Sequence, residues 1–312
     1  MSLFRKGPDA MNRPLRQSLI TALAVAGIGL SAIHVAAQEE EAIGQGEAIA
    51  EAEAEGMHFP LKKPPLLDWT FAGVFGNYDP AQLQRGFQVY REVCSFCHGI
   101  KYVAFRNLGE PGGLGYSEAE VAALAAEYEI NDGPNEEGEM FTRPGRPSDR
   151  FPSPFPNDHA AAQANGGAVP PDLSLMAKAR GASRGPVWTV LDFFTQYQEA
   201  GPNYIHALLT GYGEEPPHDL TIPDAVHYNP YFLSGPAIAM PPPLSEGVVE
   251  YSDGSPETVD QYATDVSAFL MWTAEPHLVA RKHLGFQVLV FLAVFAALMY
   301  LTKRRVWTAV AH

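Results

Sequence analysis

The chain has 312 residues with 36 acidic and 21 basic side chains, so its formal net charge is -15. This surplus of negative charge argues against a nucleic-acid partner and favours a basic one. The length suits one large domain or two small ones, and 27 prolines and 28 glycines predict that much of the chain is loop.

Residues 1–37 have the pattern of a secretory signal peptide. Four basic residues precede the apolar run 19–33, and the small residues 35–37 fit a cleavage site before Gln38. An uncleaved N-terminal anchor is the alternative, and Met11 is a second candidate start. Residues 38–65 then form an acidic leader, because 38–56 hold seven Glu and no Lys or Arg, a composition typical of poorly ordered segments.

A helix is predicted from Pro80, with Asp79 as its N-cap, because proline is favoured at the first helical position. Leu83, Phe87 and Tyr90 recur along it at helical spacing. The apolar stretch 66–75 precedes this helix and should pack against the same domain. The helix leads directly into the sharpest motif of the chain.

That motif is Cys94-Ser95-Phe96-Cys97-His98, which reads C-x-x-C-H and is the attachment signature of a c-type haem. Two thiols at this spacing can form thioethers with the haem vinyl groups, and the adjacent imidazole can bind the iron. A bare C-x-x-C also serves redox dithiols and zinc sites. Since the chain has only 2 cysteines, no second pair exists to complete a four-cysteine zinc site and no disulfide framework is expected.

The middle of the chain is acidic and then basic. Residues 118–139 carry eight acidic side chains and no basic ones, with a helix predicted over 118–129 and a Gly/Asn/Glu loop after it. This charge would bias the field seen by a cationic partner. Among the arginines that follow, Arg180 is the first candidate to pair with a haem propionate, and Arg150 or Arg143 is a weaker one. A plain surface charge is the alternative for each.

Two apolar helices are predicted over 187–211, broken at 200–202 (Ala-Gly-Pro). His206 in the second of them is read as a core residue rather than an iron ligand. Met240 is followed by three prolines, which stiffen the loop that holds its sulfur, so it is the best candidate for a methionine iron ligand.

A further helix is predicted from Ser255-Pro256, and the uncharged run 284–301 follows it. Its 18 residues span roughly 27 Å as a helix, about one hydrocarbon core. A buried soluble helix is the alternative. The expected organisation is therefore a periplasmic haem domain over 66–280, a transmembrane anchor over 281–305 and a cytoplasmic tail over 306–312.

Several stretches occur together in a fixed order: DPAQLQRGFQVYREVCSFCHG, NGGAVPPDLSLMAKARG, LLTGY, YNPYF and AIAMPPPL, then the C-terminal anchor. In this respect the chain resembles the cytochrome c1 family of the cytochrome bc1 complex, of the alphaproteobacterial or mitochondrial type. The resemblance extends over 66–305 and is far more specific than C-x-x-C-H alone.

The resemblance implies a mainly α fold, a class I-like cytochrome c domain with long loop insertions and one C-terminal transmembrane helix. It implies one covalent haem c on Cys94 and Cys97, with His98 and Met240 as axial iron ligands and Arg180 on a propionate. Electrons would come from the Rieske iron–sulfur protein and go to a cytochrome c, beside cytochrome b in a dimeric complex of the cell inner membrane. No quinone site and no independent catalytic site are expected in this chain.

Three features depart from the family pattern. The acidic segments 38–56 and 118–139 are longer than the family minimum, His206 stands where an aromatic or aliphatic residue is expected, and the disulfide of some bacterial members is absent. Two other functions stay open at this point. One is a membrane-anchored cytochrome c of a terminal oxidase or nitric oxide reductase. The other is a periplasmic thiol-disulfide or metal-binding protein.

Overall fold

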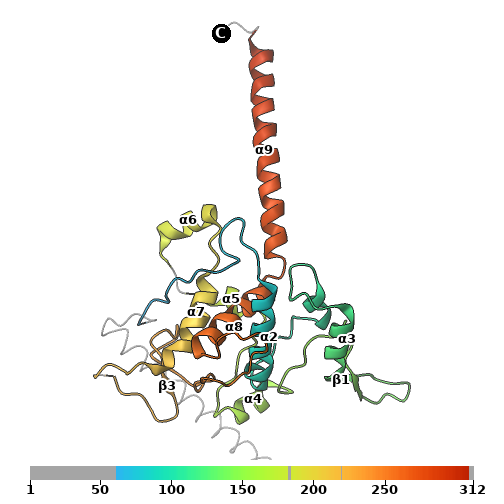
Figure 1. Ribbon diagram of the computed structural model, residues 1–312, viewed down its shortest axis with the longest axis vertical. Helices are drawn as coiled ribbons and strands as arrows, with labels where there is room; N and C mark the ends of the chain where they lie inside the picture. The colour runs from blue at the N-terminus through green and yellow to red at the C-terminus, as the bar shows by residue number, and fades with distance from the viewer. Residues whose placement is uncertain (1–60, 182–183, 219, 309–312) are drawn as a thin grey trace, which may run out of the picture. The chain divides into compact units, whose positions relative to one another are not determined.

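The described part of the chain is mostly helical, and its short strands form two two-stranded antiparallel sheets (Figure 1). The computed structural model describes residues 61–181, 184–218 and 220–308, all within one compact unit. The elements are, in order, α2 (Pro80–Glu92), η1 (Cys94–Phe96), η2 (Phe105–Gly109), α3 (Glu118–Ala126), β1 (Glu129–Asp132), β2 (Phe141–Pro144), α4 (Asp158–Ala164), α5 (Met176–Ala179), α6 (Pro186–Thr195), α7 (Ala200–Thr210), η3 (Gly211–Gly213), β3 (His227–Tyr228), β4 (Ala237–Ile238), α8 (Val259–Ala274) and α9 (Leu278–Trp307).

The mainly α fold and the helix that leads into the haem motif are confirmed. The side chain of Asp79 accepts a hydrogen bond from the amide of Ala81 at 3.0 Å, and Pro80 is the first helical residue. The face of α2 that carries Leu83, Phe87 and Tyr90 is buried. The predicted signal peptide and nearly all of the acidic leader lie outside the described residues.

Helices α2 and α8 form the most extensive contact between helices of the described chain. Their backbones approach so closely at Gly86 that a Cβ added there would collide with the carbonyl oxygen of Asp265. Phe269 and Trp272 of α8 stack on each other in the core, and Phe87 packs against Phe269. The glycine therefore fixes how deeply α2 is set into the core.

An ion pair crosses the same contact. Asp265 is fully buried, and its carboxylate accepts from Nε of Arg85 at 2.9 Å and from the hydroxyl of Tyr251 at 3.0 Å. Gln261 donates to both carboxylate oxygens at 3.0 Å. Both oxygens of the buried carboxylate thus accept hydrogen bonds, which is the condition for a buried charge to be tolerated.

Two predicted helix boundaries were wrong. The break between α6 and α7 lies at 196–199 rather than at 200–202, because Gln196 adopts a left-handed conformation (φ 58°) that ends α6. Pro202 is accommodated within the first turn of α7, where its missing N–H would have had no helical partner. Helix α8 begins at Val259 rather than after Ser255-Pro256, because the Thr258 side chain caps it by accepting from the amide of Gln261.

The predicted loop after α3 contains a hairpin instead. Strand β1 pairs antiparallel with β2, with Glu129 opposite Pro144 and Asp132 opposite Phe141. Arg143 on β2 joins Asp132 to Asp149, which ties the hairpin to the following segment. The exposed acidic side chains that follow β1 form the tip of this hairpin.

Helix α9 is long and apolar enough to cross a membrane, and its most apolar 18-residue stretch is entirely exposed. It begins at Leu278, earlier than the predicted anchor, so Arg281 and Lys282 lie within its first turns. Lys282 is buried and its ammonium donates to the carbonyl of Phe71 at 2.6 Å. The base of the helix is therefore fixed to the helical domain.

Removing the carboxylate in Asp265→Ala should destabilise the protein by about 3 kcal/mol, since it leaves the partly buried Arg85 guanidinium short of its main partner. Glu127→Ala is the matched control, because Glu127 pairs with Arg91 at an exposed site and should cost less than about 1 kcal/mol. Thermal unfolding of the detergent-solubilised protein measures both. Equal shifts would contradict the structural role of the buried pair.

Candidate haem site

The end of α2 brings Cys94, Cys97 and His98 together on one turn. The helix ends at Glu92, and η1 begins with the first cysteine. The carbonyl oxygen of Cys94 accepts hydrogen bonds from the amides of Cys97 at 3.2 Å and His98 at 2.9 Å. Both sulfurs and the imidazole are therefore carried by a backbone turn that is closed on itself.

The two thiols are free, and the first packs partly against the hydrophobic core. Burial raises the pKa of the Cys94 thiol to about 12, with the neighbouring Cys97 as a second cause. A thiol with such a pKa is protonated at neutral pH, whereas the reactive cysteine of a thiol-disulfide enzyme has a lowered pKa. The environment of Cys94 therefore does not favour the thiolate that attacks in thiol-disulfide exchange.

His98 is oriented by a backbone carbonyl. Its Nδ1 lies 2.8 Å from the carbonyl oxygen of Pro171, an acceptor that requires the ring proton on Nδ1 and leaves the lone pair on Nε2. Burial lowers the pKa of His98, although the Pro171 carbonyl and the Asp172 charge oppose this. The lowered pKa favours the neutral ring, and no hydrogen bond to Nε2 is found among the described residues. A neutral imidazole with an available ring nitrogen is the form that binds a metal.

The segment that carries Pro171 is itself held in place. Asp172 accepts from the amides of Lys101 at 2.9 Å and Ser174 at 3.0 Å, and the Leu173 amide donates to the carbonyl of Gly99 at 2.8 Å. Sequence reasoning missed Pro171 and Asp172 as supports of His98. Both lie in the VPPDL stretch that carried the resemblance, which was the available signal.

Met240 lies just after β4 and is half-buried. The hydroxyl of Tyr212 donates to its backbone carbonyl at 3.1 Å, so η3 holds the loop at the predicted ligand. The sequence did not predict that Tyr212 holds the backbone of Met240, although this tyrosine ends the LLTGY stretch that contributes to the resemblance. Among the described residues, no hydrogen bond or ion pair joins Met240 or Arg180 to the Cys94–His98 turn, and their roles stay predictions.

The three candidate arginines have different surroundings. Arg143 is committed to Asp132 and Asp149, and it holds the pKa of Asp149 at about 2. Arg150 donates to the carbonyl oxygens of two residues that follow the haem motif, 101 and 102, at 3.3 Å. Arg180 is exposed at the end of α5 and makes no ion pair in the described part of the chain. It is therefore the arginine most available to an anionic group.

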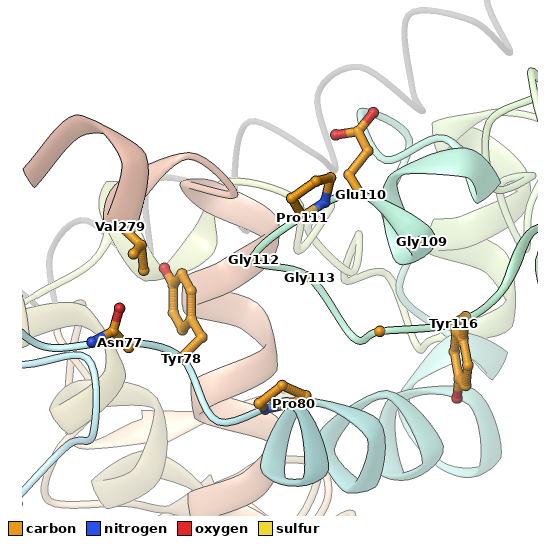
Figure 2. A pocket seen from close by; sticks show the side chains of 11 residues that line it. Asn77, Tyr78, Pro80, Gly109, Glu110, Pro111, Gly112, Gly113, Tyr116 and Val279 are labelled. Atoms are coloured by element: carbon orange, nitrogen blue, oxygen red, sulfur yellow. The ribbon is translucent and has the colours of Figure 1, made fainter. Parts of the chain in front are cut away.

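A hollow of about 290 Å³ lies elsewhere, between the glycine-rich loop 109–115, Tyr78 and Val279 (Figure 2). Its lining includes one acid, Glu110, and no histidine, cysteine, lysine or arginine. The Tyr78 hydroxyl lies within hydrogen-bond distance of the carbonyls of Met271 and Glu275. This lining offers no constellation for acid–base or nucleophilic chemistry.

The donor set fits a c-type haem better than a metal ion alone. Within the described ranges, no group of three or more His, Cys, Asp or Glu side chains could hold a metal. An attachment turn at the end of an amphipathic helix, a neutral imidazole with a free Nε2, and a long apolar C-terminal helix are the features of a membrane-anchored c-type cytochrome.

Comparison with known proteins narrows this class to a family. The sequence model of the Cytochrome C1 family matches residues 69–310. "Cytochrome b/c1" of Bradyrhizobium diazoefficiens is 62% identical over 245 residues, which are 78% of this chain and 36% of that protein. "Cytochrome c1" of Rhodospirillum rubrum is 48% identical over 260 residues, 78% of this chain and 88% of that protein. "Cytochrome b-c1 complex catalytic subunit, mitochondrial" of Candida albicans is 40% identical over 310 residues, 99% of this chain and 96% of that protein.

The chain therefore belongs to the cytochrome c1 family, which binds haem. It spans about a third of the Bradyrhizobium relative and most of the length of the other two.

His206 is buried, as predicted for a core residue. Its Nε2 lies 3.0 Å from Asp260, and its Nδ1 has no partner among the described residues. Burial lowers the pKa of His206 below its ordinary value of 6.5, although Asp260 opposes the shift. The folded protein thus resists taking up a proton that the unfolded chain accepts.

The lowered pKa of His206 predicts how the free energy of unfolding changes with pH. As pH falls through 6.5 the unfolded chain binds more protons than the folded one, so the free energy of unfolding should fall. His206→Phe should flatten this part of the profile. Thermal unfolding temperatures of the two proteins between pH 5 and pH 8 (roughly the span in which histidine titrates) measure the difference. Parallel profiles would show that His206 contributes nothing.

Proposed function

We propose that this chain is the haem-bearing subunit of a cytochrome bc1 complex. It accepts electrons from the Rieske iron–sulfur protein and passes them to a soluble or membrane-anchored cytochrome c, in respiratory or photosynthetic electron transport. Support comes from its membership of the cytochrome c1 family and from the haem-attachment turn on a membrane-anchored helical domain. When bound, the haem supplies one-electron transfer, and the chain itself holds and orients that group.

Cys94 and Cys97 would hold one haem c through thioether bonds, and His98 and Met240 would be the ligands of its iron. The observation that carries this assignment is the 2.8 Å contact of His98 Nδ1 with the Pro171 carbonyl. It fixes the ring through the nitrogen that does not bind iron, as is usual for histidine ligands. The neutral thioether of Met240 would favour the ferrous state and raise the potential.

The residues around the ligands keep the site rigid. Tyr212 holds the backbone of Met240, and the three prolines after it restrict the loop. Arg180 pairs with a propionate, because its guanidinium is exposed and matches a carboxylate in shape. A site that moves little between oxidation states suits electron transfer.

The proposed topology follows from the signal peptide and the anchor. Cleavage after residue 37 leaves the leader 38–65 and the haem domain 66–280 in the periplasm. The anchor 281–305 spans the inner membrane, and residues 306–312 are cytoplasmic. The chain lies beside cytochrome b in a dimeric complex.

The alternative of an oxidase or nitric oxide reductase cytochrome is not favoured, because the family match is to cytochrome c1.

Met240→Leu tests the iron ligands. It should abolish the sulfur–iron charge-transfer absorption and lower the midpoint potential, because leucine offers no ligand atom. Met140→Leu is the control, since that side chain is 67% exposed on the hairpin and should change neither property. Optical spectra and a redox titration of the haem-loaded protein measure both. An unchanged spectrum in Met240→Leu would eliminate Met240 as the ligand.

A second test concerns the acceptor. Acidic groups near the haem edge should steer a basic cytochrome c, so the second-order rate of its reduction should fall by about tenfold or more as salt is raised. The hairpin tip presents Glu136, Glu137 and Glu139 to solvent, and their replacement by Gln shows how much of the slope they supply. Stopped-flow rates at several ionic strengths measure it. Salt-independent rates would rule out electrostatic steering.

A further inference from the structure

Helix α6 exposes apolar side chains that no described element covers. Val187, Trp188, Val190 and Leu191 are 69, 48, 62 and 43% exposed. The only charged residue of the helix is Asp192, and it pairs with Arg184 at 2.8 Å. An exposed apolar surface of this kind marks a contact with a partner or a membrane.

The residue that ends α6 contacts α9 close to the point where α9 becomes apolar. Gln196, the residue that caps α6, accepts a hydrogen bond from Nη1 of Arg281 at 3.4 Å. Arg281 precedes Leu284, the start of the uncharged run, by three residues, which is about 4.5 Å along a helix. Figure 1 shows α6 on the side of the helical domain from which α9 leaves.

The side chain of Phe75, from the loop before α2, also lies beside the start of the apolar part of α9. Phe75 is 67% exposed, and its ring centroid lies 5.3 Å from that of Phe286 in α9. Phe286 lies two residues inside the uncharged run. Since Lys282 fixes the base of α9 to the carbonyl of Phe71, the loop that carries Phe75 is held at this height.

Cationic side chains accompany these apolar ones, although the chain as a whole is acidic. Lys178 and Arg281 both form ion pairs with Glu275, so these three side chains together carry a net positive charge. The Arg184 guanidinium lies 4.4 Å from the ring centroid of Trp188. Tryptophan with nearby cations is the composition found where proteins meet lipid headgroups.

We propose that α6, together with Phe75, lies in the interfacial layer of the phospholipid bilayer that α9 spans. The side chains of Val187, Trp188, Val190 and Leu191 enter the boundary between headgroups and acyl chains, as in interfacial amphipathic helices. This contact is a second attachment beside the transmembrane helix, and it restrains the orientation of the haem domain above the membrane. The proposal depends on membrane anchoring by α9 and not on the iron ligands.

Spin labelling tests it in the haem-loaded, full-length protein. Because Cys94 and Cys97 are the only cysteines and are consumed by the haem, Val190→Cys provides one labelling position, and Val187→Cys is the second variant should the first misfold. Val248→Cys is the matched control, an exposed valine outside α6. Each protein carries a nitroxide, is reconstituted in phosphatidylcholine–phosphatidylglycerol bilayers, and is analysed by power saturation with oxygen and with a water-soluble nickel chelate.

The label at position 190 should be relaxed by oxygen and protected from the nickel chelate, while the label at 248 shows the reverse. Access of the nickel chelate to position 190 equal to that at 248 would overturn the proposal. Protection from both reagents would also overturn it, because it would mean that another protein subunit covers α6. More than one label per chain would instead count against haem attachment to the cysteines, so the two failures are distinguishable.

Discussion

The close crossing of α2 and α8 is the constraint on which the rest of the structure depends. It is possible because residue 86 is glycine and the carbonyl of Asp265 occupies the space of a side chain. The buried Arg85–Asp265 pair fixes the same crossing electrostatically. Since the Cys94–His98 turn is the direct continuation of α2, its position relative to the core is set by this contact.

Two segments far apart in sequence then complete the candidate site. The VPPDL stretch supplies the Pro171 carbonyl that orients His98, and η3 supplies Tyr212, which holds the backbone of Met240. Both supports act on the residues predicted to be the iron ligands. They explain why long stretches without regular structure can still carry a rigid site: the loops are held by hydrogen bonds to defined backbone groups.

Local signals made part of this predictable from sequence. The Asp79 cap, Pro80 and the apolar spacing identified α2, because these patterns act within a few residues, and C-x-x-C-H predicts haem attachment at the turn that follows it. The contacts that hold His98 and Met240 could not be predicted in the same way. Each contact uses a backbone carbonyl, which every residue carries, so the residue types do not reveal it, and its partner is set by tertiary contacts. The prediction of a helix break at 200–202 (Ala-Gly-Pro) was wrong for a related reason. A proline breaks a helix interior but is compatible with a first turn, and only the fold decides which position it takes.

The proposed role of this chain is that of the haem subunit in a cytochrome bc1 complex. The most direct measurement is affinity capture of the full-length chain from membranes solubilised in mild detergent, with identification of the captured proteins and assay of quinol–cytochrome c reductase activity. We predict that a cytochrome b and a Rieske protein are captured and that the activity is sensitive to antimycin. Capture of an oxidase or nitric oxide reductase subunit in their place would contradict the account.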